Sequence, residues 1–201
     1  IANPEVKMPA LTQYAQTGIG PVWQGSLFPF LMITIACGAV SGFHALISSG
    51  TSPKLLDKES HVRLVGYGGM LGESFVAIIA LISAVSMEPG LYFAINSPAS
   101  VIGKTEETAA QIISSWGFSI SAEELKRMAQ LIEEPTILSK VGGAPAFAIG
   151  IALIFARITG EALLAFWYHF AILFEVVFIL TTIDSGTRVG RYILQDLLGG
   201  V

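Results

Sequence analysis

The sequence has little charge and almost no cysteine. Charged residues make up 13% of the chain and hydrophobic residues 53%, and the mean hydropathy is +0.67. The net charge of −4 gives no basic face, so we expect no nucleic-acid partner. The single cysteine, Cys37, leaves no disulfide framework and no cysteine-based metal cage within this chain. This composition is typical of a membrane protein rather than of a soluble domain.

The sequence also lacks the common catalytic and nucleotide-binding motifs. It contains no HExxH, GxSxG or P-loop pattern, so we do not expect an enzyme. His44 and His169 alone are thin evidence for a haem, and we expect no cofactor and no metal. No signal peptide opens the chain, which we interpret as an internal piece of a longer protein.

The first long apolar run, Leu27 to Ser49, contains no acidic or basic residue and is long enough to cross a hydrocarbon core about 30 Å thick. Helical spacing nevertheless places its polar side chains on one face: Thr34, Cys37, Ser41, His44 and Ser48. A polar face of this kind predicts contact with other protein or with water rather than with lipid. Gly38 and Gly42 form a GxxxG step, where two backbones can approach closely. We expect residues 1–26 to be a loop, and 50–53 to end this helix.

A second apolar helix is expected from about Val65 to Met87. The link before it, 54–63, carries Lys54, Lys58 and Arg63, which places it on the cytoplasmic side by the positive-inside rule. Glu73 is the one charged side chain of this helix and lies on its small-residue side. Residues 27–87 therefore predict two transmembrane helices joined by a cytoplasmic link.

From Glu88 the character of the chain changes, and residues 88–143 predict an extracytoplasmic helical cap. Thr105 is a candidate cap for a helix that runs to Ser115. Ser121 and Glu124 have the spacing of a capping box, before an apolar face that Pro135 ends. We expect two amphipathic helices here.

The last third contains two further apolar stretches, 144–160 and a helix from about Ala162 to Ile183. The first is shorter than the roughly 20 residues that a crossing needs. If it does not cross, Arg188 and Arg191 in the tail are cytoplasmic, and if it crosses they lie outside. Its length favours a non-spanning segment, with 162–201 forming a transmembrane helix and a cytoplasmic tail.

Titratable groups inside a membrane are functional candidates, because burying them unpaired costs several kcal/mol. Glu73 is the strongest candidate for proton coupling, and Glu175 is the second. His44 is a candidate for substrate binding or proton relay, although a hydrogen bond to a neighbouring helix explains it equally well. For His169 a structural role is favoured. Thr181 and Asp184 offer oxygen ligands for a cation such as sodium, unless Asp184 simply pairs with Arg188.

Several long runs resemble the carbon starvation protein A family: ITIACGAVSGFHALISSGTSPKLL, GYGGMLGESFVAIIALISA, EPGLYFA and FWYHFAILFEVVFILTTIDSGTR. The resemblance extends over nearly the whole chain and is weakest at about 96–111. It implies that the chain is about a third of a large, multi-pass protein of the bacterial inner membrane. It further implies import of peptides during carbon starvation, or import of pyruvate with protons by related members. The partners would be protons, the bilayer and the remaining helices.

The resemblance also implies a fold, an inverted-repeat bundle like that of amino-acid transporters, with broken helices at the midplane. Residues 27–49 would then be a broken helix, unwound from Cys37–Gly38 to Gly42. A structural membrane subunit without transport activity is the alternative of another class. It explains the small-residue faces but not the ionisable groups inside the membrane.

If the helix is interrupted near Gly38 and Gly42, a Gly38→Ala, Gly42→Ala double variant of the full-length protein should lose transport. Each glycine lowers helix stability by about 1 kcal/mol relative to alanine, so the double variant favours a continuous helix. Substrate uptake into reconstituted vesicles measures the effect. Undiminished uptake by the double variant would contradict the interruption.

Overall fold

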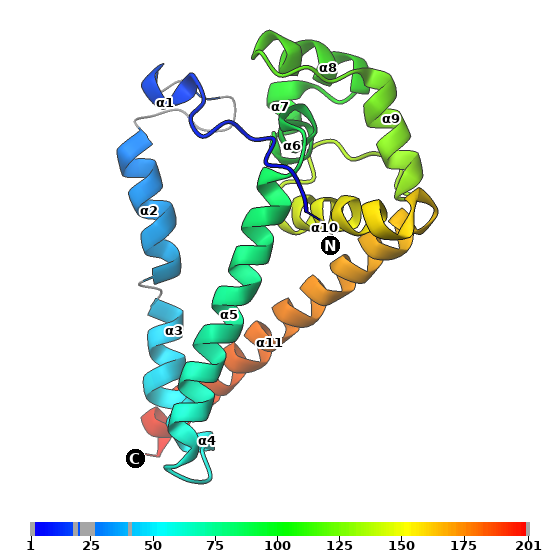
Figure 1. Ribbon diagram of the computed structural model, residues 1–201. Helices are drawn as coiled ribbons and strands as arrows, with labels where there is room; N and C mark the ends of the chain where they lie inside the picture. Colours follow the sequence, from blue (N-terminus) through cyan, green and yellow to red (C-terminus); the bar gives the residue numbers. More distant parts are fainter. Residues whose placement is uncertain (1–2, 18–19, 21–26, 40–41, 200–201) are drawn as a thin grey trace. The chain divides into compact units, whose positions relative to one another are not determined.

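The computed structural model describes residues 3–17, 20, 27–39 and 42–199, and every regular element in these ranges is a helix (Figure 1). The all-α prediction is therefore confirmed. The chain divides into two compact units: Ile1–Ser26 with Ala77–Glu175, called the core unit below, and Leu27–Val76 with Val176–Val201, called the span unit. Two long helices, α5 (His61–Val85) and α11 (Leu164–Leu198), each have residues in both units.

The span unit begins with α2 (Leu27–Ala39) and α3 (Gly42–Leu46). The predicted unwinding from Cys37–Gly38 to Gly42 is wrong at its described ends, because α2 stays helical through Ala39 and Gly42 is already in α3. Residues 40–41, between them, lie outside the described residues. The expected helix end at 50–53 is wrong, because a π-helical turn, η1 (Ile47–Thr51), leads directly into α4 (Ser52–Leu55). The Ser52 N–H donates to the Ile47 carbonyl five residues back. That wider turn places Pro53 in the first turn of α4, where its missing N–H has no helical partner to lose.

Helix α5 begins at His61, four residues earlier than the sequence predicted, and ends at Val85 rather than Met87. The early start follows from a turn at 58–62, in which the His61 N–H donates to the Lys58 carbonyl. At the other end, the Val85 carbonyl accepts from the N–H groups of Lys7 and Met8, at 2.8 and 3.1 Å. Apart from α1 (Tyr14–Thr17), the described part of 1–26 has no helix, and it lies against the core unit through these bonds.

Residues 88–143 contain four helices where the sequence predicted two. Helices α8 (Glu106–Ser115) and α9 (Ala122–Leu131) were expected, while α6 (Pro89–Asn96) and α7 (Ala99–Ile102) were missed. Helix α5 ends before Glu88, and Pro89 stands in the first turn of α6, where proline is favoured. Ser97 is extended before Pro98, which ends α6 after two turns.

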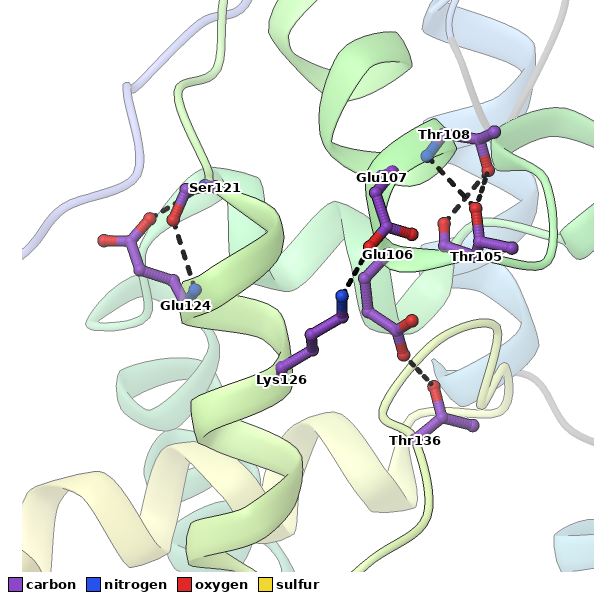
Figure 2. A network of polar contacts seen from close by, with 8 residues as sticks. All are labelled: Thr105, Glu106, Glu107, Thr108, Ser121, Glu124, Lys126 and Thr136. Carbon is purple, nitrogen blue, oxygen red and sulfur yellow. Dashed lines mark hydrogen bonds and ion pairs between the residues drawn. The ribbon is translucent and has the colours of Figure 1, made fainter.

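Figure 2 shows the N-terminal caps of α8 and α9 and the ion pair between these two helices. The Thr105 hydroxyl accepts from the Thr108 N–H, and Ser121 and Glu124 form the complete capping box, so both predicted caps are confirmed. Lys126 of α9 pairs with Glu107 of α8, and this pair lowers the pKa of the Glu107 carboxyl. These contacts hold the two amphipathic helices against each other by their polar edges.

The buried core belongs to the core unit and is built from small and branched side chains of α6 to α10. The fully buried members include Ala94, Ile95, Ile113, Leu125 and Ile132. Leu125 and Ile132 belong to the apolar face predicted for α9, which is therefore confirmed. Phe93 stacks on Phe118 with ring centroids 4.8 Å apart. In Figure 1, α8, α9 and α10 surround α6.

Helix α10 (Ala144–Thr159) has the predicted bounds and is 16 residues long. Gly143 and Gly160, at φ +84° and +89°, flank it in the left-handed region that favours glycine. Its small residues are buried against the end of α5. The Ser83 hydroxyl donates to the Phe147 carbonyl at 3.0 Å, and a Cβ on Gly150 would come within 2.7 Å of the Ser83 carbonyl oxygen.

After the short 3₁₀ turn η2 (Glu161–Leu163), α11 runs for 35 residues to Leu198. The predicted end near Ile183 is therefore wrong, and the expected tail is a continuation of the same helix. Asp184, Arg188 and Arg191 lie on it. Neither proline nor a helix-ending glycine interrupts this stretch, and Arg188 pairs with Asp184 at 3.0 Å, one turn away, which supports the helix.

A Gly150→Ala variant should destabilise the full-length protein, because the added methyl group meets backbone atoms of Ser83 that have no room to move. Overpacking of this kind costs about 1–3 kcal/mol. The melting temperature in detergent measures the effect. Gly68→Ala in α5 is the matched control, since a Cβ there meets nothing within 4 Å in this chain. Equal melting temperatures for the Gly150→Ala variant and the unchanged protein would contradict this packing.

Candidate functional site

The two units hold different groups of the predicted site residues. His44, Glu73, Thr181 and Asp184 belong to the span unit, while His169 and Glu175 belong to the core unit. Cys37 and the hinge candidate Gly38 belong to the backbone of α2, Gly42 opens α3, and Ser41 lies outside the described residues. Within each unit, no hydrogen bond, ion pair or ring contact among the described residues joins one of these candidates to another.

Glu73 is exposed at the middle of α5 and has no ion pair or hydrogen bond with the residues that the structure describes. The apolar residues around it, such as Leu71, Phe75 and Ile78, are also exposed within this chain. A carboxyl in such surroundings needs a partner from outside the segment: another helix of a longer protein, or water in a cavity.

Glu175 continues the buried face of α11. Leu164, Tyr168 and Ala171 on that face are each 2% exposed, and Glu175 follows Ala171 by four residues and is half-buried. It has no hydrogen-bond partner among the described residues. On the same side of the helix, Tyr168 is buried, whereas Glu161 and Thr182 are exposed.

Tyr168 connects α11 to the loop after α9. Its hydroxyl donates to Glu134 at 3.2 Å, and Lys140 pairs with the same carboxylate at 2.6 Å. The Lys140 ammonium is the main reason why the pKa of Glu134 is lowered. His169 is exposed and lies edge-on to the Tyr168 ring, with centroids 5.2 Å apart. Sequence reasoning missed this network, because 34 residues separate Glu134 from Tyr168.

His44 is exposed on α3 beside Phe43, with ring centroids 6.0 Å apart. Further along the same unit, Lys54 lies over the Tyr192 ring of α11, 4.4 Å from its centroid. Between them, the Thr51 hydroxyl is buried in the π turn and has no hydrogen-bond partner among the described residues. The sequence signal for this turn is a proline soon after a run of small polar residues.

Thr181 and Asp184, the candidate cation ligands, each have a partner within α11. The Thr181 hydroxyl donates to the Phe178 carbonyl at 2.7 Å, and the Asp184 carboxylate pairs with Arg188. Among the described residues, no cluster of three His, Cys, Asp or Glu side chains could hold a metal ion. Of the two alternatives for Asp184, the structure contains the ion pair.

Two stretches are long and apolar enough to cross a membrane, His61–Val85 and Glu161–Leu198. Only 6% and 17% of their most apolar windows are buried, whereas the core helix of a soluble protein is mostly buried. These helices define an all-helical protein with two candidate membrane spans, one carrying Glu73 and the other Glu175.

The comparisons with known proteins give the family. The family described as carbon starvation protein CstA matches residues 1–201, and the chain belongs to it, as the sequence predicted. A peptide transporter CstA of Helicobacter pylori strain J99 is 60% identical over 98% of this chain. The peptide transporter CstA of Escherichia coli K12 is 56% identical over 100% of the chain. The pyruvate/proton symporter BtsT of Escherichia coli K12 is 54% identical over 99%.

The chain spans 29% to 31% of the length of these relatives, as expected for part of a larger protein. The relatives are transporters by name, which agrees with the two candidate membrane spans of this chain. No solved structure matches the chain.

Proposed function

We propose that this chain is part of a secondary active transporter that imports short peptides in symport with protons. The names of the relatives support peptides as the substrate. The observation that carries proton coupling is the pair of unpartnered carboxyls, Glu73 on α5 and Glu175 on α11, in helices long enough to span. A carboxyl in water-poor surroundings takes up a proton readily and releases it when water reaches it.

The proposed layout follows from the family's fold. The chain contributes part of an inverted-repeat bundle in the bacterial inner membrane. His44 on α3 would take part in substrate binding. Residues 88–143 form an extracytoplasmic cap, and the link 54–63 and the end of α11 lie in the cytoplasm. The remaining helices of the full protein complete the binding site.

Pyruvate import with protons is the second candidate, because BtsT is 54% identical to this chain. Sodium is the alternative coupling ion, although Asp184 is occupied by Arg188. A purely structural subunit is a weaker proposal, since it gives no reason for carboxyls on the two spanning helices. Uptake of labelled peptide and of labelled pyruvate into vesicles that contain the full-length protein distinguishes peptide import, pyruvate import and a structural subunit.

Glu73→Gln should abolish uphill peptide uptake driven by a pH gradient, while exchange of peptide across the membrane persists in part. Glutamine has the shape of the protonated acid but cannot release a proton. Glu59→Gln, in the exposed link before α5, is the matched control and should leave uptake unchanged. If Glu175→Gln loses the uptake and Glu73→Gln keeps it, Glu175 is the coupling group. If both keep it, proton coupling through this chain is wrong.

Helix α10 should not cross the membrane, since its 16 residues extend about 24 Å at 1.5 Å each, less than the hydrocarbon core. Single cysteines at Ser60, Ser114 and Gln195, all exposed, report the sidedness in a cysteine-free background. A membrane-impermeant thiol reagent should label Ser114→Cys from outside and the other two from inside. Labelling of Gln195→Cys from outside would mean that α10 crosses.

A further inference from the structure

The core unit contains a recess that the proton-coupling carboxyls do not touch. It consists of two adjoining cavities of about 320 and 220 Å³. Small-molecule sites commonly have about 300–1,000 Å³, so the recess has room for a small organic molecule. It lies where the N-terminal segment, the end of α5, α6, α9, α10 and the start of α11 meet.

The floor of the recess is apolar. Leu91 and Leu164, 5% and 2% exposed, are part of the packed core, and Met128 and Leu153 line both cavities beside them. Methionine is flexible and polarisable, so a floor that includes Met128 accommodates side chains of different shapes.

The rim carries both signs of charge. Lys7 pairs with Glu88 at 2.6 Å, and Arg127 pairs with Glu161 at 3.0 Å. Both pairs are largely exposed, and such pairs are weak, so either carboxylate is able to accept a further cation. Arg157, at the last turn of α10, also lines the recess and has no ion pair or hydrogen bond with the residues that the structure describes.

We propose that this recess binds short zwitterionic peptides, with Arg157 holding the C-terminal carboxylate, Glu88 and Glu161 facing the N-terminal ammonium, and the apolar floor taking a side chain. A free guanidinium is a strong and geometrically specific partner for a carboxylate. The two acids on the rim disfavour a small anion without a cation, such as pyruvate. This inference rests on the proposed peptide import and adds a peptide site separate from the carboxyls that move protons.

A photoreactive dipeptide tests the site directly. Alanyl-photoleucine, which carries a diazirine, should cross-link the full-length protein within α9 and α10, the helices that supply Met128 and Leu153. Alanyl-leucine should compete for this labelling. Its C-terminal amide, its N-acetyl derivative and pyruvate should compete at least about tenfold less well, because each lacks one of the two charges.

Arg157→Gln should raise the dipeptide concentration needed for labelling about tenfold and abolish the preference for the free acid over the amide. Arg157→Lys keeps the charge and should retain part of that preference. Lys104→Gln removes an exposed positive charge of the same unit outside the recess and should change nothing. Arg157 is exposed and unpaired, so its replacement leaves the packing of the core unit intact.

Labelling that avoids α9 and α10, or a free-acid preference that survives Arg157→Gln, would overturn the inference. Uptake driven by a pH gradient is measured in parallel, so that the two proposals fail separately. If uptake occurs without the predicted labelling, the proposal of a peptide site in the recess is wrong and the proposal of peptide import stands. If labelling depends on Arg157 but no uptake occurs, the proposal of import is wrong and the peptide site stands. If neither labelling nor uptake is seen, both proposals are wrong.

Discussion

The close contact between α10 and the end of α5 determines the arrangement of the core unit. The Ser83 hydroxyl bonds to the Phe147 carbonyl at 3.0 Å, and Gly150 leaves no room for a side chain between the two helices. Since α10 is fixed there, the turn at Gly160 and the start of α11 follow from it. Leu164 and Tyr168 then reach the core, and Glu134 meets the Tyr168 hydroxyl. The recess beside Leu91 and Arg157 is a product of the same crossing.

The elements that were predicted correctly from the sequence are those with local signals. Thr105 and the Ser121–Glu124 box start α8 and α9 through bonds to residues three positions away, and such spacing is visible in a sequence. The bounds of α10 were also correct, because glycine flanks an apolar run. Family membership was evident from long, specific runs of residues.

The errors have physical causes of two kinds. Residues up to Pro53 were expected to end a helix, although proline is favoured in a first helical turn and a π turn makes that position available at Pro53. The helix that Pro89 opens, α6, was missed. The other errors concern contacts between distant residues. The Glu134–Tyr168 bond and the charged rim of the recess join segments far apart in the chain, and no periodicity reports them. Glu73 and Glu175 have no hydrogen-bond partner among the described residues, and the chain spans only 29% to 31% of the length of its relatives.

The two glycines that flank α10 also bear on how the protein responds to its membrane. With Gly143 and Gly160 at positive φ, α10 keeps its length, and its small residues are tied to Ser83. Helices α5 and α11, at 25 and 35 residues, exceed the roughly 20 that a bilayer requires and adjust to a thicker or thinner one by tilting. If α5 and α11 cross the membrane as proposed, lipid thickness acts on these two long helices, whereas contacts with Ser83 hold α10.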